Sequence, residues 1–316
     1  MKTLSIGTTF SGIGAPEQAL QNIGIEHSVE WSCDIDKRSR DTYAKNFNCK
    51  ETYEDIRNID LNKLSHVDLY VFGFPCQSFS VAGKGLGMKD DRGLLIYNSV
   101  DILKKIRPKF FIAENVKGLI NHDGGNTFKV ILSLLENCGY KVSYKVLNSI
   151  EFGIPCNRQR IYLVGVRNDL SFEYLFPEGP AIPIHFKNFL DSDIEEKYFL
   201  DQQRAQKILE ICKDSILGFE YKKDFGEIKG ANKMSFFGGK IRYSGIMWCQ
   251  NCVDIHGVLL PDGRMRKLTP RECANLQGFP KSFVLNDKDY IHYKQFGNTM
   301  TVNVIEAIIK NLIKIK

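Results

Sequence analysis

The sequence predicts an α/β protein built on a doubly wound, Rossmann-like sheet, with a smaller domain inserted into it. Strand and helix patterns alternate over the first 167 residues, the pattern changes after Arg167, and helical patterning returns near the C-terminus. Alternation of this kind produces a sheet that binds its ligands at the carboxyl ends of the strands. A length of 316 residues is long for one hydrophobic core, and it therefore also favours a large domain with a smaller one.

Apolar runs and helical spacing place the elements of the first domain. Pro16 opens the first helix, because proline is favoured in the first helical turn. Gly139 ends the last helix of this region, a position that glycine often takes. Strands are predicted over 4–10, 28–33, 68–73, 110–115, 142–146 and 160–166, and helices over 94–106 and 127–138.

The second domain begins where proline and glycine gather, between 177 and 183. A helix is predicted over 201–217, followed by short glycine-rich strands up to residue 263. The chain ends in an apolar stripe at helical spacing from Val302 to Ile313, which we expect the first domain to cover. We therefore predict a first domain over 1–171, an inserted domain over 172–263, and a return segment over 264–316 that completes the first domain.

The composition excludes membrane and secreted classes. It is 43% hydrophobic and 25% charged, as in ordinary globular proteins. No run is long and apolar enough to span a bilayer, and the N-terminus lacks the pattern of a secretion signal. Nine cysteines without such a signal favour free thiols in the cytoplasm. Cys249 and Cys252 form a single CxxC pair without further ligands, so two incidental cysteines are favoured over a zinc module and no metal site is predicted.

Positive charge is concentrated in one part of the chain. Residues 228–284 hold nine Lys/Arg against three Asp/Glu, whereas residues 173–227 hold seven against twelve. The basic segment also contains aromatic side chains, a combination that suits a phosphate backbone and unstacked bases. A solvated charged face is the alternative interpretation.

A cysteine at a strand end is the most informative residue. The sequence over 73–80, Gly-Phe-Pro-Cys-Gln-Ser-Phe-Ser, follows the apolar run 69–72. Cys76 thus lies just after the end of a buried strand, next to Pro75, and is followed by polar residues. This placement is typical of a nucleophile. A glycine-rich loop over 83–87 follows it. The alternative is that Cys76 is a small buried hydrophobe.

The turn over 10–15, Phe-Ser-Gly-Ile-Gly-Ala, joins the first strand to the first helix. Gly12 and Gly14 allow a tight turn and close approach of a ligand to the backbone. Glu17 stands where a dinucleotide fingerprint has its third glycine, and an acid there would disfavour a pyrophosphate. We therefore expect a nucleoside without phosphates.

Two further strand-end positions fit such a nucleoside. Asp34 lies 20 residues after Gly14 at the end of the second strand, where a carboxylate can hold ribose hydroxyls. Asp55 and Ile56 could close similarly on the edge and face of an adenine.

Glu114 and Asn115 end another strand and should lie on the same rim as Cys76. A carboxyl group in such a cleft can have a raised pKa and act as a proton donor. Arg158 and Arg160 could pair with that carboxyl group or polarise a carbonyl. The alternatives are a strand-end glutamate without a role and arginines in surface ion pairs.

These motifs, in this order, resemble the cytosine-C5 DNA methyltransferases of bacterial and phage type. The most specific are Pro-Cys-Gln at 75–77, Glu-Asn-Val at 114–116 and Gln-Phe-Gly-Asn at 295–298. Further blocks are 10–14, 153–160 and 266–280. The resemblance covers nearly the whole chain outside about residues 172–263. The chain departs from the family pattern at Thr8, where an acid is common, at Ala15, at Cys156 and at Thr299.

The resemblance implies a cofactor, a substrate and a set of roles. The cofactor would be S-adenosylmethionine and the substrate a cytosine in a specific duplex DNA sequence, flipped out of the stack. Cys76 would add to carbon 6, Glu114 would protonate or hydrogen-bond N3, and the loop over 81–92 would close over the site. Arg160 would bind the ring carbonyl, with Arg158 supporting it. Cofactor contacts are implied for Phe10, Gly12, Gly14, Asp34, Ile35, Asp55, Ile56, Pro75, Leu95 and Asn298.

The region over 172–263 would recognise the target sequence, since it matches no family block. Lys240, Arg242, Gln250 and Asn251 are candidates for base or phosphate contacts. We expect a monomer that binds double-stranded DNA, with a separate cognate restriction endonuclease as a candidate partner. The competing interpretations are a tRNA cytosine-C5 methyltransferase and a non-catalytic DNA-binding regulator with this fold. The former's Cys-Phe-Thr-type motif is not visible here, which favours DNA.

Overall fold

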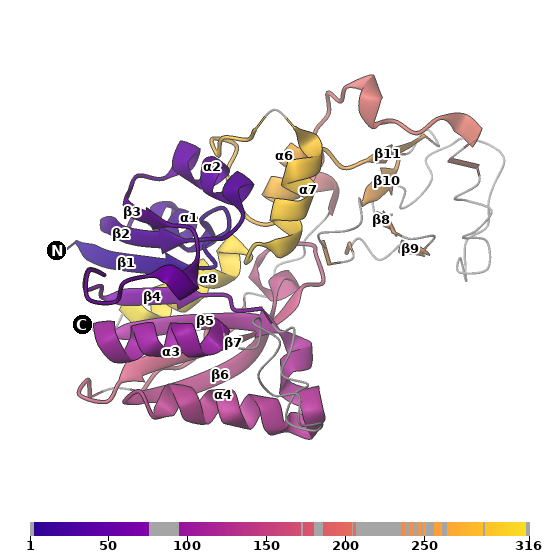
Figure 1. The fold of residues 1–316 in the computed structure, drawn as a ribbon. Helices are drawn as coiled ribbons and strands as arrows, with labels where there is room; N and C mark the ends of the chain where they lie inside the picture. The colour runs from indigo at the N-terminus through magenta and orange to yellow at the C-terminus, as the bar shows by residue number, and fades with distance from the viewer. Residues whose placement is uncertain are drawn as a thin grey trace, which may run out of the picture. The chain divides into compact units, whose positions relative to one another are not determined.

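The structure is a computed structural model in which the chain forms two compact units (Figure 1). The first unit comprises the described residues within Met1–Leu147, Gln159–Glu178 and Met300–Lys316, and the second those within Asn148–Arg158 and Gly179–Thr299. Cys76, the loop over 81–92 and most of the predicted helix over 201–217 lie outside the described residues. The structure describes residues 3–75, 95–171, 173–179, 186–203, 205–206, 235–237, 240–242, 246–247, 249–250, 256–260, 264–286 and 288–313.

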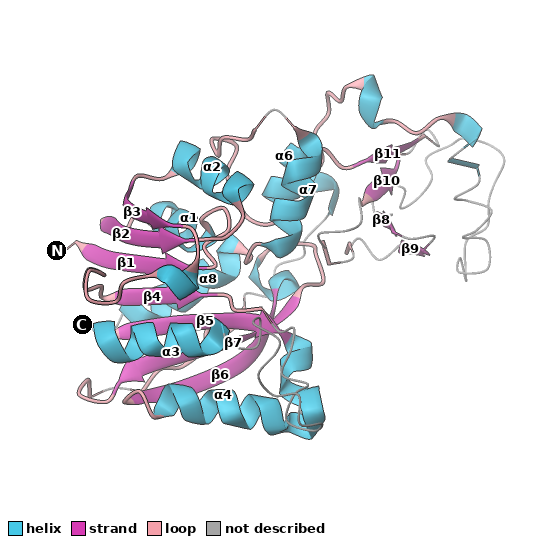
Figure 2. Ribbon diagram, viewed as in Figure 1, coloured by secondary structure: helices cyan, strands magenta, loops and turns pink. Residues whose placement is uncertain are grey.

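The first unit is built on a seven-stranded sheet in the order β3-β2-β1-β4-β5-β7-β6 (Figure 2). The strands β3, β2, β1, β4 and β5 pair in parallel, and β7 runs antiparallel to β5. The doubly wound α/β architecture is therefore confirmed. The strands are β1 (Leu4–Thr9), β2 (His27–Cys33), β3 (Cys49–Tyr53), β4 (Leu69–Phe72), β5 (Phe110–Val116), β6 (Tyr140–Asn148) and β7 (Gln159–Arg167).

Helices cover both faces of this sheet. Helices α3 and α4 lie along one face, and α1 and α8 lie along the other (Figure 1). The short 3₁₀ helices η1 (Ile56–Asn58) and η3 (Lys117–Gly125) follow β3 and β5. The α-helices of this unit are α1 (Ala15–Asn22), α2 (Lys37–Asn46), α3 (Leu95–Ile106), α4 (Asn126–Glu136) and α8 (Val302–Ile313).

Aromatic rings fill the core beneath α3 and α4. Tyr70 and Phe72 of β4 stack on one another, Phe111 packs against Phe72 from the neighbouring β5, and Trp31 of β2 reaches Tyr70 from beyond β1. All four are fully buried, and burial of a side chain of this size contributes roughly 1.5–3 kcal/mol. Gly7 makes room for the indole, because a Cβ there would lie 2.3 Å from the ring of Trp31.

The C-terminal stripe is covered by the first unit, as predicted. Val302, Ile305 and Ile308 are fully buried on α8, which packs against α1. Asn22 of α1 donates a hydrogen bond to Glu306 of α8 at 2.7 Å. The last described helix is therefore part of the framework that supports the glycine turn at the start of α1.

The second unit contains a four-stranded sheet in the order β11-β10-β8-β9, whose strands pair antiparallel. Arg266 of β11 makes a buried ion pair with Glu272 of α6, and Glu272 also completes a capping box with Thr269, the N-cap of that helix. The elements are η4 (Ser149–Phe152), η5 (Phe186–Phe189), η6 (Glu196–Tyr198), β8 (Ser235–Phe237), β9 (Lys240–Arg242), β10 (Gly257–Leu259), β11 (Met265–Lys267), α6 (Pro270–Asn275) and α7 (Asp289–Asn298).

The two units are bounded differently from the predicted domains 1–171, 172–263 and 264–316. Of the predicted return segment, only residues from Met300 onward belong to the first unit. The short segment Asn148–Arg158 belongs to the second. Contacts within the second unit explain this: Cys156 forms a β-bridge with Met247, and Arg158 binds main-chain carbonyls near both 250 and 298.

Candidate active site at the strand ends of the first unit

The turn after β1 adopts a left-handed backbone at three positions. Phe10, Gly12 and Gly14 have φ of 53°, 55° and 86°. A side chain at Gly14 would also collide with the ring of Phe47, since its Cβ would lie 2.2 Å away. A Cβ at Gly12 would meet nothing within 4 Å, so the backbone there is open to a ligand. The left-handed Phe10 costs about 1–2 kcal/mol, a strain that concentrates at functional turns.

Asp34 is hydrogen-bonded to this turn. Its Oδ2 accepts a hydrogen bond from the Gly12 amide at 2.7 Å, and its Oδ1 accepts one from the Asp36 amide at 2.8 Å. Burial raises the pKa of Asp34, and these amide donors and the nearby Arg40 act against that rise. The glycine turn and the acid at the end of β2 therefore form one structural feature, and each carboxylate oxygen keeps a further lone pair for a ligand.

The neighbouring residues line the same edge of the sheet. Ile35 is 72% exposed, an unusual exposure for its size. β2 and β3 are in register as far as Cys33 opposite Tyr53, so the loops that follow them are neighbours. Asp55 in the second loop caps η1 and pairs with Arg57, while Ile56 is buried.

Three other predicted cofactor residues are placed as follows. Leu95 begins α3 and packs, half-buried, against the core cluster to which Phe10 also packs. Pro75 is half-buried at the end of the described segment that precedes Cys76. Asn298 is the last residue of α7, in the second unit, and is exposed.

Glu114 and Arg160 face each other across β5 and β7. Arg160 Nε lies 3.1 Å from Glu114 Oε1, and the two side chains are only 17% and 13% exposed. Arg160 Nη1 also donates to the Gln159 carbonyl at 2.9 Å. The pair arises because the antiparallel register sets Val116 opposite Arg160. This is a half-buried strand-end pair, not the solvated surface pair of the alternative interpretation.

The carboxylate of Glu114 also lies against the segment that leads to Cys76. A Cβ on Gly73 would be 3.5 Å from Glu114 Oε2, so glycine permits a close approach. The buried side chain of Asn115 donates to the Phe74 carbonyl at 2.8 Å. Asn115 thus holds the backbone two residues before Cys76, and Glu114 lies beside the backbone three residues before it.

Arg158 is positioned differently from Arg160. It is 4% exposed in the second unit, with Nη1 donating to the carbonyls of Gln250 and Gly297 at 3.0 and 3.1 Å. Nη2 donates to the Thr299 carbonyl at 2.6 Å. Its guanidinium therefore holds together the main chain on either side of Asn298.

Candidate base-reading residues are described only in part. Gln250 is 3% exposed, accepting from Gln277 Nε2 at 2.9 Å, so its side chain belongs to the interior of the second unit. Lys240 and Arg242 lie on β9, whose side chains are outside the description, as is Asn251.

Glu17 does not face the ligand turn. It is fully buried, with Oε1 accepting from Thr8 Oγ1 at 3.0 Å and from Tyr43 OH at 2.7 Å. Burial raises its pKa, which favours the neutral acid. The expectation that Glu17 disfavours a phosphate at the turn is therefore wrong, because the carboxyl group points into the interior. Thr8 is the residue that could have indicated this orientation. The family often has an acid at that position, which would face Glu17, whereas the hydroxyl of Thr8 donates a hydrogen bond to it.

Other kinds of site find little support. Within the described ranges, no cluster of three His, Cys, Asp or Glu side chains is arranged to bind a metal ion. Helices in the same ranges all lack the length and apolar character needed to cross a membrane.

The sheet, with its antiparallel seventh strand and a glycine turn bound to a strand-end acid, defines a Rossmann-like α/β protein with its site at the strand ends. Residues 4–314 match the family described as C-5 cytosine-specific DNA methylase, and the chain belongs to that family. The resemblance seen in the motifs is thereby confirmed, and the protein is an enzyme, a DNA (cytosine-5-)-methyltransferase.

Individual relatives agree with this assignment. The chain is 38% identical over 301 residues to the type II methyltransferase M.NgoBI of Neisseria gonorrhoeae, covering 94% of this chain and 89% of the relative. It is 30% identical over 430 residues to the orphan methyltransferase M.SPRI of Bacillus phage SPR, covering 99% and 98%. The solved structure of the S. pombe Dnmt2 methyltransferase shares the fold, with a TM-score of 0.74 at 19% identity over 98% of each chain.

Proposed function

We propose that this enzyme transfers a methyl group from S-adenosylmethionine to carbon 5 of a cytosine in a specific duplex DNA sequence, through a transient bond between Cys76 and carbon 6. One observation carries the proposal: Glu114 is paired with Arg160 at 3.1 Å and lies against Gly73, three residues before Cys76. A carboxyl group, a guanidinium and the segment bearing the thiol thus converge at one strand end.

The residues of the first unit suit an adenosyl ligand. The open backbone at Gly12 and the remaining lone pairs of Asp34 suit ribose hydroxyls, and exposed Ile35 offers an apolar surface for a base. When bound, S-adenosylmethionine supplies an electrophilic methyl group on a sulfonium. Contacts from Asp55, Ile56, Leu95, Pro75 and Asn298 are part of the same proposal.

Carbon 5 of cytosine is a poor nucleophile, and the protein must activate it. The Cys76 thiolate adds to carbon 6, and Glu114 protonates or hydrogen-bonds N3, so that carbon 5 gains enamine character. Arg160 holds Glu114 through Oε1 and would bind the ring carbonyl. After methylation, carbon 5 loses its proton and Cys76 leaves as thiolate. Arg158 supports the site indirectly, as a positioning residue for the chain around Asn298.

A base inside a duplex cannot reach such a cleft, so we propose that the target cytosine is flipped out. Residues within 172–263 would read the flanking sequence. M.NgoBI is named a type II methyltransferase, which supports a separate cognate restriction endonuclease as a partner, whereas M.SPRI is named an orphan. We propose that the enzyme acts as a monomer in the cytoplasm.

Methyl transfer from labelled S-adenosylmethionine tests this function. The purified enzyme should label duplex DNA and not tRNA, and bisulfite sequencing should then show the modified cytosine in one sequence context. Cys76→Ala should abolish transfer while DNA and cofactor binding persist. Cys49→Ala, which removes a half-buried thiol on β3, should leave it unchanged. Labelling of tRNA alone would favour the RNA enzyme, and DNA binding without any transfer would favour a regulator.

A further inference from the structure

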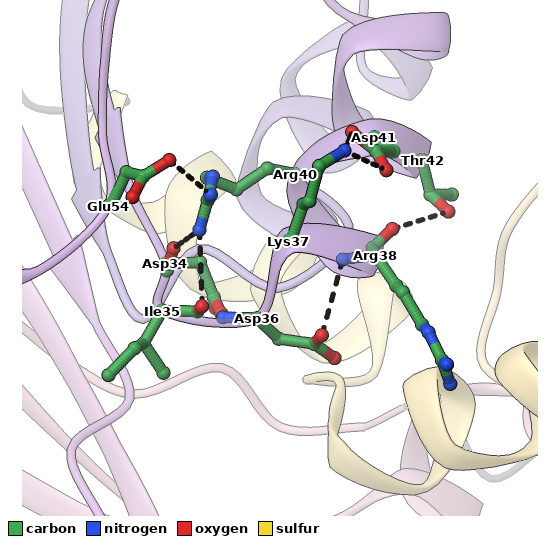
Figure 3. Close-up of polar contacts among 9 residues, drawn as sticks. All are labelled: Asp34, Ile35, Asp36, Lys37, Arg38, Arg40, Asp41, Thr42 and Glu54. Atoms are coloured by element: carbon green, nitrogen blue, oxygen red, sulfur yellow. Dashed lines mark hydrogen bonds and ion pairs between the residues drawn. The ribbon is translucent and has the colours of Figure 1, made fainter.

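Arg40 on α2 joins two loops at the edge of the proposed cofactor site (Figure 3). Its Nη1 donates to the main-chain carbonyls of Asp34 and Ile35 at 2.8 and 3.1 Å. Its Nη2 lies 2.6 Å from Glu54 Oε1. The arginine side chain is only 14% exposed, whereas that of Glu54 is 79% exposed. One guanidinium therefore binds two consecutive carbonyls and a carboxylate.

The local sequence explains why Arg40 reaches this position. Asp36 caps α2, its side chain accepting from the Arg38 amide at 3.2 Å. Arg40 lies one turn into the helix, with its amide bound to the Asp36 carbonyl at 3.1 Å. Because helical side chains lean toward the N-terminus, the guanidinium extends back over the loop that precedes the helix.

The two loops need such a connection. The β2–β3 ladder ends at Cys33 opposite Tyr53, followed by one more bond from the Asp34 amide to the Tyr53 carbonyl at 3.3 Å. Beyond that point, Asp34 and Ile35 lie in one loop and Glu54 in the other. Arg40 bridges them where the sheet no longer does.

The hydrogen bonds to the carbonyls of Asp34 and Ile35 restrict the backbone from which these two side chains extend. The Asp34 carboxylate is then directed at the Gly12 amide, at 2.7 Å, and the side chain of Ile35 is left 72% exposed. A ligand that uses both groups would find them already arranged, and preorganisation of this kind raises affinity by reducing the ordering cost of binding.

We propose that Arg40, held by Glu54, is a positioning residue for the nucleoside part of the methyl donor. The proposal rests on the proposed cofactor site and assigns it a support that touches no reacting atom. A nucleoside with free ribose hydroxyls is the ligand chemistry that it serves. The loss of Arg40 should therefore weaken binding of the donor and leave the chemical step intact once the donor is saturating.

The experiment compares Arg40→Met and Arg40→Lys with a matched control on the same helix. Lys37→Met removes the exposed ion pair to Asp41, at 2.9 Å, also drawn in Figure 3. Equilibrium binding of S-adenosylhomocysteine and of 5′-methylthioadenosine is measured for each, with kcat at saturating donor and KM for DNA. Thermal unfolding confirms that each variant is folded, and Glu54→Gln provides a milder test of the same bridge.

Arg40→Met should raise both dissociation constants about tenfold, a loss typical of a charged hydrogen-bonding group. Arg40→Lys should recover only part of the lost affinity, because a single ammonium group cannot bind the carbonyls of one loop and the carboxylate of the other at the same time. Glu54→Gln should cost about twofold, and Lys37→Met nothing. Values of kcat and KM for DNA should stay within about twofold of the wild type.

Unchanged dissociation constants in a folded Arg40→Met enzyme would overturn the proposal. So would a loss seen with S-adenosylhomocysteine but not with methylthioadenosine, because the effect would then lie outside the nucleoside. If Arg40→Met does not fold, unchanged binding in both Arg40→Lys and Glu54→Gln overturns it instead. Failure of the wild-type enzyme to bind either ligand would refute the proposed cofactor, which is a different outcome.

Discussion

Arg158 and Arg160 are two residues apart, yet they belong to different units and have different surroundings. Arg158 is 4% exposed and binds three main-chain carbonyls within the second unit. Arg160 is the second residue of β7, at the half-buried start of the strand, and pairs with the carboxylate of Glu114 in the first unit. The hydrogen bonds of Arg158 to main-chain carbonyls maintain structure, whereas Arg160 beside a strand-end carboxylate is the arginine that we propose for the substrate.

The same contrast extends to the acids. Glu272 in the second unit is fully buried but binds Arg266 with both oxygens, at 2.6 and 2.7 Å. Among the described residues, Asp34 in the first unit accepts one hydrogen bond at each carboxylate oxygen, both from main-chain amides. Arg266 and Glu272 of the second unit thus satisfy one another in its interior, whereas the Asp34 oxygens at the strand-end edge of the first unit keep lone pairs for a ligand.

Arg158→Met should show the largest effect, and the effect should be on stability. It leaves three buried carbonyls without their donor, so the free energy of unfolding should fall by about 3–5 kcal/mol. Arg160→Met should lower it by no more than about 1 kcal/mol, because its site is partly solvated. Urea unfolding of both variants checks this, and equal losses would remove the distinction between the two arginines.

Glu114→Gln should affect the reaction rate and not the stability of the protein. The amide cannot donate a proton as a carboxylic acid does, and we expect kcat to fall about a thousandfold with DNA and donor binding retained. Single-turnover methylation at saturating DNA and donor measures the change. A fall in thermal stability large enough to explain the lost activity would assign Glu114 to structure instead.

The buried acid Glu17 should make stability depend on pH. Its pKa is raised in the folded protein by burial, so the folded state holds the proton more tightly than the unfolded chain does. The contribution of Glu17 to the free energy of unfolding is therefore complete at a pH below 4.5, the ordinary pKa of a glutamate. That contribution is lost as the pH rises from there through the raised pKa of the folded state. Glu17→Gln should remove this loss and stabilise the protein at pH 8 by on the order of 1 kcal/mol. Thermal unfolding from pH 5 to 8 measures it, and parallel curves for the two proteins would contradict a raised pKa of Glu17 in the folded state.

Ile35→Ala should have the smallest effect. The side chain is 72% exposed, so its removal should leave stability unchanged. Loss of its apolar surface should weaken donor binding about threefold to tenfold. Isothermal titration with S-adenosylhomocysteine checks the change, and an unaltered dissociation constant would place the base of the ligand elsewhere.

The apolar strands and the amphipathic helices could be predicted because their buried residues are apolar and recur at the spacing of a strand or a helix. β4 is wholly buried and α8 carries a continuous apolar stripe, and both lie within a residue or two of the expected positions. β3 and α2 were not predicted, since Cys-Lys-Glu-Thr-Tyr and Lys-Arg-Ser-Arg-Asp-Thr-Tyr-Ala-Lys-Asn are mostly polar. β3 is an edge strand, which needs no apolar face toward solvent.

The sequence could place several candidate site residues at strand ends, but it could not identify the residues that support them. Strand ends located Glu114 and Asp34, whose neighbours then followed from the register of the sheet. Their closeness in sequence grouped Arg158 with Arg160 at the start of one strand, but β7 begins only at Gln159 and Arg158 belongs to the second unit. Arg40 was missed because it lies on α2, and the direction of Glu17 depends on Tyr43 of the same helix.

The bond between Cys76 and the target base can be tested directly with duplex DNA carrying 5-fluorocytosine at the target position. After addition and methylation, carbon 5 bears fluorine in place of the departing proton, so the thiol cannot be released. We expect a stable protein–DNA complex in the presence of S-adenosylmethionine, with the DNA attached to the peptide that contains Cys76. Cys76→Ala should form none, and Cys49→Ala should form as much as the wild type. An active enzyme that forms no such complex, or one attached through another residue, would contradict the account.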